Sequence, residues 1–159
     1  MNALTKALAG VFLLLSPWFL VQVFILVVAP DEAIEEMPIC SDTSSNCAHL
    51  GGGEYHRMEV TTVVFEGQSL EATKSLALDY IEEQDGDILF ESESESEYFV
   101  HFVEHTPFWL FPDDVFLSIT VEDDNSSRIE LHSESRLGYG DLGVNPERLE
   151  LFYEALASD

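Results

Sequence analysis

Asp113 and Asp114 are the residues whose types and spacing come closest to a chemical function in this chain. Two adjacent carboxyl groups near an arginine can act as a general acid and a general base. A hydrolase-like enzyme that uses either aspartate is therefore one hypothesis. Because no nucleophile with a positioned base accompanies them, we assign no catalytic residue and leave open whether the chain is an enzyme.

The polar residues that surround these aspartates in the sequence favour a structural network. Such a network would fix the last predicted hairpin against the last predicted helix through ion pairs and helix caps. Its expected members are Asp113, Asp114, Arg136, Asp141 and Arg148. A binding notch is the alternative, and its candidate residues are Asp113, Asp114, Ser133, Ser135, Arg136, Asp141, Asn145 and Arg148.

Motifs that could hold a cofactor or a metal are weak in this chain. The segment Gly138–Gly143 matches G-x-G-x-x-G, but the chain ends 16 residues later, so no second parallel strand can follow. Its glycines instead predict a tight turn. His101 and His105 lie about 13 Å apart if their segment is a strand, so they cannot bind one ion together. We expect no cofactor and no metal, and we expect His132 to be a surface histidine.

Several short segments form a recognisable set: Ser133–Tyr139, Asp141–Asn145, Arg148, Phe111–Val115, Cys40 and Asn46–Cys47. Together they resemble the signature of an uncharacterised family called domain of unknown function 1499, over roughly residues 37–157. The family usually carries an arginine where His132 stands in this chain. The resemblance implies no reaction, substrate or cofactor.

The net charge restricts the partners and the environment of the protein. With 31 Asp plus Glu against 6 Lys plus Arg, the formal net charge is -25 at pH 7. High salt screens the self-repulsion that such a charge causes, so we predict the protein of a halophile. An acidic extracellular domain from another source is the alternative. Nucleic acid is not an expected partner, because binding to phosphates needs basic patches.

Residues 7–29 form an uncharged and mostly apolar stretch. At ~1.5 Å per residue a helix of this length can cross a hydrocarbon core of ~30 Å, so we predict one transmembrane anchor within residues 1–30. A signal peptide would have an apolar region of only ~7–15 residues, and Pro30 makes a poor cleavage site. Lys6 precedes the stretch and acidic residues follow it, which places the rest of the chain outside the cell membrane.

Residues 31–54 are acidic and then glycine-rich, which predicts a tether between the membrane and a domain over residues 55–159. The tether contains both cysteines of the chain, Cys40 and Cys47. Outside the cell this pair predicts a small disulfide loop, and free thiols are the alternative if the topology is inverted. A zinc site is not expected, because structural zinc needs four ligands and prefers more closely spaced cysteines.

The domain is predicted to be α+β with the order β-α-β-β-β-β-α. The expected strands are 57–65, 87–92, 98–104, 113–122 and 128–136, and the expected helices are 69–84 and 145–156, the second capped by Asn145. Short connections between successive strands favour an antiparallel sheet. Both helices should cover one face of that sheet, because each has one apolar side.

The register of the last hairpin follows from its apolar pattern. Its buried face should carry Val115, Leu117, Ile119, Val121, Ile129 and Leu131. Paired residue numbers must then have an even sum. A sum of 250 leaves residues 123–127 as a turn and places Asp114 opposite Arg136, whereas a sum of 248 makes these two residues diagonal neighbours. Asp113 should point to the other face, towards Ser133.

A run of large apolar residues, Phe-Trp-Leu-Phe at 108–111, stands in a predicted connection between strands. It could cover the core, line a pocket or touch the bilayer.

We predict a membrane-tethered, extracytoplasmic domain that serves as a non-enzymatic binding or structural module of the cell envelope. The alternatives are a hydrolase-like enzyme using Asp113 or Asp114 and a domain that binds an apolar ligand. The sequence identifies no protein or small-molecule partner.

Overall fold

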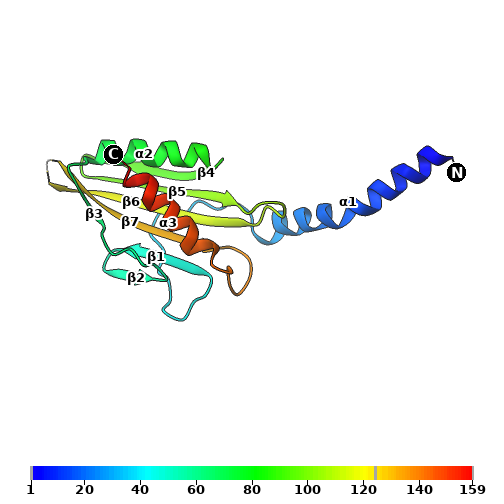
Figure 1. Cartoon of the computed structure of the whole chain (residues 1–159), viewed down its shortest axis with the longest axis horizontal. Coiled ribbons are helices and arrows are strands. Elements are labelled where there is room, and N and C mark those ends of the chain that lie inside the picture. Colours follow the sequence, from blue (N-terminus) through cyan, green and yellow to red (C-terminus); the bar gives the residue numbers. More distant parts are fainter. Residues whose placement is uncertain (1, 124, 159) are drawn as a thin grey trace.

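The computed structural model describes residues 2–123 and 125–158, without the side chains of residues 3, 6–9 and 11. A long N-terminal helix, α1 (Ala3–Val28), extends away from an α+β domain that contains an antiparallel sheet (Figure 1). The predicted fold class is confirmed for the domain. The order differs from the prediction because two additional strands precede the others.

The sheet has the strand order β2-β1-β7-β6-β5-β4, and β3 also pairs with β7. The strands are β1 (Cys47–Gly51), β2 (Glu54–His56), β3 (Val64–Glu66), β4 (Asp87–Glu93), β5 (Glu97–His105), β6 (Pro112–Asp123) and β7 (Ser126–Ser135). All of these pairings are antiparallel. The ends of β5, β6 and β7 nearest α1 carry most of the polar residues singled out in the sequence.

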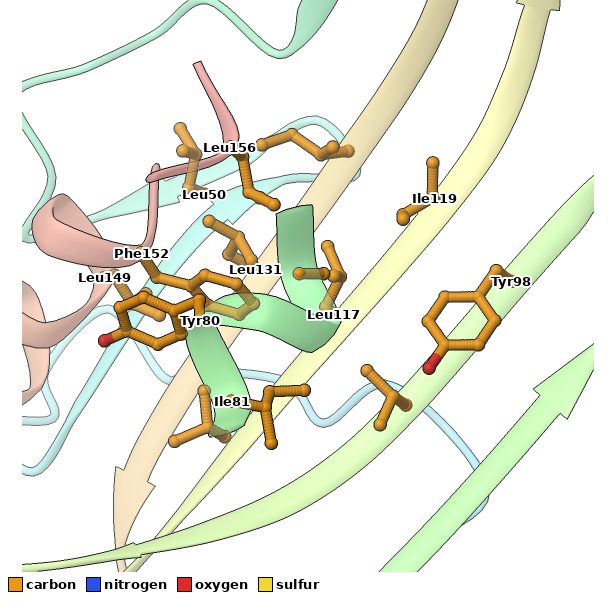
Figure 2. Close-up of a cluster of buried hydrophobic side chains, with 14 of the residues drawn as sticks. Leu50, Tyr80, Ile81, Tyr98, Leu117, Ile119, Leu131, Leu149, Phe152 and Leu156 are labelled. Carbon is orange, nitrogen blue, oxygen red and sulfur yellow. The ribbon is translucent and has the colours of Figure 1, made fainter. Parts of the chain in front are cut away.

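Two helices, α2 (Leu70–Glu83) and α3 (Val144–Leu156), pack on one face of the sheet and enclose the core (Figure 2). Tyr80 of α2 stacks on Phe152 of α3, with 4.3 Å between the ring centroids. Ser69 caps α2 by accepting a hydrogen bond from the Ala72 amide, so the predicted helix over 69–84 is confirmed. These contacts fix α3, and the polar residues on it, against the sheet.

The start of α3 differs from the prediction. Gly143, with φ +93°, occupies the cap position, and no side chain caps the helix. Asn145 lies inside the first turn, where its side chain is buried and bonded to neighbours from three other segments. The predicted Asn145 cap is therefore wrong, because those buried partners take up the side-chain amide.

The segment before α2 also departs from the prediction. The predicted strand over 57–65 is reduced to β3, because Arg57 adopts a left-handed conformation with φ +59° and the chain pairs with β7 only from Val64 onward. Within the predicted tether, Cys47–Gly51 forms strand β1, and every residue of this strand is buried between β2 and β7. That part of residues 31–54 therefore belongs to the sheet.

In the β6–β7 hairpin the numbers of paired residues add up to 248, since Leu117 pairs with Leu131 and Ser118 with Glu130. The predicted register, in which these numbers add up to 250, is wrong. The strands extend to Asp123 and from Ser126, with a bulge after Val121, so the turn is shorter than predicted. Asp124, part of the predicted turn, lies outside the described residues. The buried face is as predicted except at Val121, which is 42% exposed.

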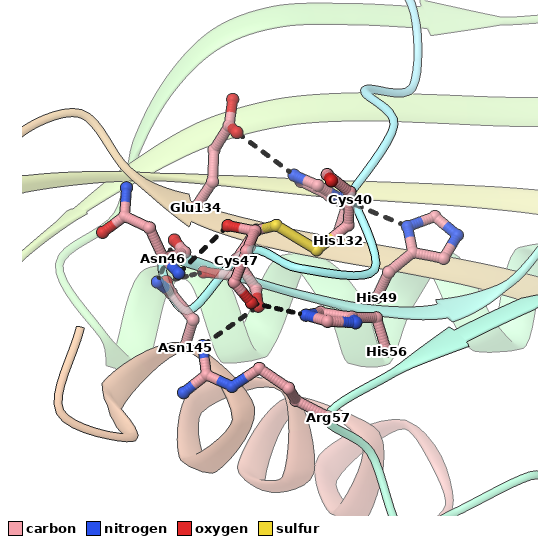
Figure 3. Close-up of a disulfide and its surroundings, with 12 residues drawn as sticks. Cys40, Asn46, Cys47, His49, His56, Arg57, His132, Glu134 and Asn145 are labelled. Atoms are coloured by element: carbon pink, nitrogen blue, oxygen red, sulfur yellow. Dashed lines mark hydrogen bonds and ion pairs between the residues drawn. A yellow bond between two sulfur atoms is a disulfide. The ribbon is translucent and has the colours of Figure 1, made fainter. Parts of the chain in front are cut away.

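The second face of the sheet is partly covered by the chain between α1 and β1. This segment is held by the disulfide Cys40–Cys47 (Figure 3). A hydrogen bond from the Ile34 amide to His101 holds it as well. The predicted disulfide is thus confirmed. His132 is fully buried on this face, so the prediction of a surface histidine is wrong: the covering segment, distant in sequence, excludes water from it.

Among the residues that the structure describes, no helix is both long and apolar enough to cross a membrane. The predicted transmembrane anchor within residues 1–30 therefore gains no support here. The side chain of Lys6, on which the predicted orientation depends, lies outside the described residues.

Candidate functional site

The polar residues form two networks, one on each face of the sheet. Asp113 belongs to one network and Asp114 to the other. Successive side chains of a strand point to opposite faces of the sheet. Asp113 therefore faces α3 together with Ser133, whereas Asp114 faces the covering segment together with His101. We call these the inner network and the outer network.

Arg148 of α3 is the centre of the inner network. Its Nη2 donates to Asp113 Oδ2 (2.7 Å) and its Nε donates to Glu104 Oε2 (2.8 Å). Its Nη1 donates to Ser133 Oγ and Asn145 Oδ1. Burial opposes the charged form of Arg148, but the charges of Asp113 and Glu104 outweigh that effect and raise its pKa above the usual value. One guanidinium thus neutralises two buried carboxylates.

The inner network continues from Arg148 through Asn145 to Asp141. Asn145 Nδ2 donates to Asp141 Oδ2 (2.7 Å) and to the Asn46 carbonyl (2.9 Å), and it lies 3.1 Å from Ser135 Oγ. Asp141 also accepts two hydrogen bonds from Arg57, at 2.7 and 2.8 Å, and one from the Gly143 amide. The network therefore joins the turn before α3 to β1, β7 and the residues after β2.

The pKa of Asp141 reflects its place in this network. Burial alone would raise the pKa, but the hydrogen bonds from Arg57, the Gly143 amide and Asn145 lower it below the usual value. Asp141 is therefore held as a carboxylate inside the turn that the glycine-rich sequence predicts. Its role is to fix that turn.

Asp114, Arg136 and His101 form the outer network. Arg136 donates two hydrogen bonds to Asp114, from Nε (2.8 Å) and Nη2 (2.7 Å), and a third from Nη1 to Asp31 (2.7 Å). His101 Nδ1 accepts from the Ile34 amide, so the ring proton is on Nε2, which donates to Asp114 Oδ1. Burial would raise the pKa of Asp114, but the bonds from His101 and Arg136 lower it.

Two further histidines, His49 and His132, are buried beside the outer network. Their Nδ1 atoms lie 3.2 Å apart, and His49 Nε2 lies 3.3 Å from Glu130.

In the described residues, one group offers three ligand atoms to a metal, namely Cys40, Cys47 and His56. Its sulfur atoms are joined in the disulfide, so they are not the thiolates that a metal requires.

Three members of the inner network were not predicted: Glu104, Arg57 and Asn46. The sequence could have revealed Glu104, because strand alternation places it on the same buried face as Val100 and Phe102, where a carboxylate needs a partner. No sequence pattern could have revealed Arg57 and Asn46, since both lie in irregular segments. The eight predicted binding residues are all in the two networks, and their role in binding stays a prediction.

A cavity of roughly 550 Å³ adjoins the inner network. It lies between α1, the β5–β6 loop (residues 106–111), the ends of β6 and β7, the turn over residues 137–142 and the start of α3. Its polar residues are Thr106, Asp113, Ser135 and Asp141, and its other walls are Phe24, Pro107, Trp109, Phe111, Leu137, Gly138, Gly140, Leu142 and Val144. Arg148 bonds one oxygen of Asp113, and the other has no hydrogen bond within the described residues.

A second hollow, of roughly 630 Å³, lies on the other side of the β5–β6 loop, between α1 and the end of α2. It is lined by none of the inner-network residues, and it has a larger share of polar surface than the first cavity. The cavity beside Asp113 is therefore the stronger candidate for a binding site, because apolar walls and a few convergent polar groups meet there.

The arrangement does not favour nucleophilic catalysis. Ser133 Oγ donates to Asn145 and accepts from Arg148, so no base removes its proton. Asp113 and Asp114 each accept hydrogen bonds from a guanidinium, and the lowered pKa of Asp114 weakens it as a base.

Comparison with known proteins supports the resemblance seen in the sequence. A family model described as protein of unknown function (DUF1499) matches residues 32–156. This range begins before the disulfide and includes every strand of the sheet and both helices of the domain. Among curated proteins, none matches the chain.

Proposed function

The chain belongs to the DUF1499 family, which has no assigned activity, and we propose that it is a non-enzymatic binding module that takes up an amphiphile at the α1 end of its sheet. The observation that carries this proposal is the cavity beside Asp113, with its apolar walls and its acidic end. Sites for small molecules usually have a volume of about 300–1,000 Å³, and this cavity falls within that range.

The lining of the cavity indicates the chemistry of the ligand. Aromatic and aliphatic side chains such as Phe111, Trp109 and Leu137 favour an apolar chain or ring system. Asp113, Asp141 and Ser135 supply hydrogen-bond acceptors at the polar end. A ligand with an apolar body and a hydrogen-bond-donating head group, either hydroxylated or cationic, complements both parts.

A hydrolase is the weaker alternative. The support for a binding role is that both aspartates already serve as partners of buried arginines, and that the one buried hydroxyl next to Arg148 has no base. An enzyme of this type would need a nucleophile or an activated water near a free carboxylate.

We also propose that α1 tethers the module to a membrane on its extracytoplasmic side. Phe12, Leu13, Leu14 and Leu15 are all at least 50% exposed, and four consecutive residues point to every side of a helix. Only an apolar medium can cover such a helix all round. The proposal requires α1 to enter lipid and does not require it to cross.

The disulfide supports the extracytoplasmic location, because disulfides persist mainly in oxidising compartments. Protease added to intact cells should therefore remove the domain and leave a fragment that contains α1. A full-length chain that survives until the cells are lysed would contradict the proposed side of the membrane.

The acidic composition supports a high-salt environment for the module. The net charge of -25 includes the exposed acidic residues of β4 and the turn that follows it. Salt at molar concentration reduces the Debye length to ~3 Å, which screens the repulsion between such residues. Unfolding temperatures that fail to rise between low and molar salt would contradict this part of the proposal.

Filling the cavity tests the binding role. Val144→Trp places a large ring at the cavity wall, whereas Leu151→Trp is a matched control on the same helix, at a position 54% exposed and outside the cavity. The full chain purified in mild detergent should retain an amphiphile, which mass spectrometry detects after solvent extraction. Val144→Trp should lose it and Leu151→Trp should keep it. Equal retention by both variants would exclude the cavity as the site.

A further inference from the structure

We propose that the β5–β6 loop, Thr106–Phe111, inserts into the apolar part of a lipid bilayer beside α1. This inference rests on the proposed membrane tether and goes beyond it, because it adds a second element of the domain to the membrane-bound surface. The loop follows β5 and precedes β6, and it lies against the end of α1 nearest the domain (Figure 1).

The side chains of the loop suit lipid and do not suit water. In a chain with a net charge of -25, residues 106–111 carry no charge. Phe108 is 70% exposed, Trp109 38% and Leu110 41%. Phe108 and Leu110 have positive φ angles of 69° and 54°, so this loop presents bulky apolar residues from a backbone conformation that such residues rarely adopt.

The backbone of the loop is also prepared for an apolar medium. Non-helical backbone is tolerated at membrane depth only where its polar groups are bonded within the protein. The Thr106 amide donates to the Phe111 carbonyl, the Leu110 amide to the Thr106 carbonyl and the Trp109 amide to the Pro107 carbonyl. The Phe111 amide donates to Thr106 Oγ1.

Two side chains of α1 add to this pairing. Trp18 Nε1 donates to the Phe108 carbonyl and Gln22 Nε2 donates to the Trp109 carbonyl, each at 2.8 Å. Both donors come from the helix that we place in lipid. The carbonyl oxygens of Phe108 and Trp109 therefore have hydrogen-bond partners within the protein.

The position of these contacts along α1 sets the depth of the loop. Trp18 precedes the end of α1 at Val28 by ten residues, which is about 15 Å along a helix. If α1 enters lipid beyond its last turns, the loop enters with it. Exposed apolar side chains are therefore present both on α1 and on the loop, at Phe108 and Leu110.

Lipid is the occupant that these observations favour over a protein partner. A second copy of the chain, or another protein helix, would cover one side of the loop and one side of α1. The exposed side chains surround α1 on every side, as the consecutive residues Phe12–Leu15 show, and the loop continues that surface. A medium that is apolar in all directions meets this requirement.

The test uses the unmodified full chain in phosphatidylcholine vesicles that contain a lipid with a photoreactive diazirine in the middle of its acyl chain. After illumination, mass spectrometry of peptides locates the lipid adducts. We expect adducts on Phe108–Leu110 at a level comparable to that on Leu20–Leu26 of α1. Ile88 and Leu151 are the internal controls, because they are 44% and 54% exposed on other parts of the domain and should stay several-fold less labelled.

The other outcomes are distinct. If α1 is labelled but the loop is labelled no more than Leu151, the insertion of the loop is wrong and the membrane tether stands. The loop would then be covered by protein, such as a second copy of the chain. Equal labelling of Ile88 and the loop would also overturn it, because exposure alone would explain the adducts. Absence of adducts on α1 would overturn both the tether and the insertion.

Discussion

Replacing Arg148 with methionine should lower the free energy of unfolding by about 3–5 kcal/mol, the cost of leaving buried charges without their partner. The guanidinium is 7% exposed and binds both Asp113 and Glu104. Methionine fills a similar volume but leaves both carboxylates unpaired beside the core. Urea unfolding of the full chain in mild detergent and high salt, followed by circular dichroism, measures the loss.

The matched control for this prediction is Arg128→Met. Arg128 also forms two hydrogen bonds to a carboxylate, that of Glu122, but both side chains are about 40% exposed to solvent. Solvent-exposed pairs contribute little to stability, so this variant should unfold like the unmodified chain.

Adding Asp113→Asn and Glu104→Gln to Arg148→Met should restore part of the lost free energy of unfolding, because fewer charges then remain unpaired. An Arg148→Met variant as stable as the unmodified chain would contradict the inner network.

The second large effect is expected at Asp114 and Arg136. Asp114→Asn and Arg136→Met should each destabilise the chain, and the double variant should cost less than the sum of the two, with a coupling of about 1–3 kcal/mol. The bidentate contact between the two side chains is the reason, since the second substitution removes a group that has already lost its partner. Additive losses would show that the pair does not contribute as a unit.

The coupling should depend on pH in a defined direction. The folded state lowers the pKa of Asp114 below its usual value near 3.8. A lowered carboxyl pKa gives stability that is fully present above the unfolded-state value and is lost as the pH falls through the folded-state value. The coupling should therefore be constant from pH 7 to about 5 and should decline below about pH 4. A coupling that already falls between pH 7 and 6 would contradict the assignment of this pH dependence to Asp114.

Local patterns in the sequence were sufficient for the part of the fold with short-range pairing. The strands from Asp87 to Ser135 and helix α2 were predicted because each shows its own periodicity and each strand pairs with the next. The two helices on one face followed from their apolar stripes.

Long-range pairing explains what the sequence did not reveal. Strand β1 pairs with β7 more than 80 residues later, and because it is buried on both faces it has no alternation that would mark it as a strand. The burial of His132 depends on the covering segment and not on its own strand. The predicted β6–β7 register was wrong, with paired residue numbers that added up to 250 and not to 248, because the bulge after Val121 shortens the turn.

The candidate site was partly visible in the sequence for the same reason. Strand alternation separated Asp113 from Asp114, and both networks contain the predicted arginines. Glu104 and Arg57 were missed, although they hold the inner network together. The cavity itself could not be predicted, because its walls come from α1, two loops and α3, which only the tertiary structure brings together.

Insertion of the β5–β6 loop would connect the two proposals of this work. Trp109 and Phe111 belong both to that loop and to the wall of the cavity, and Phe24 of α1 lines it as well. A cavity with walls in the bilayer surface can take an amphiphile directly from the membrane, with its apolar body in the cavity and its head group near Asp113. The occupant would then be a membrane lipid and not a solute.

The most direct measurement is the identification of what the full chain carries after purification from its own membranes. Solvent extraction followed by mass spectrometry should find one amphiphile per chain, with a hydroxylated or cationic head group and at a proportion above its share of the bulk lipid. We expect this species to be lost when Val144 is changed to tryptophan. A chain that carries nothing, or that carries lipids in the same proportions as the surrounding membrane, would contradict the proposed binding function.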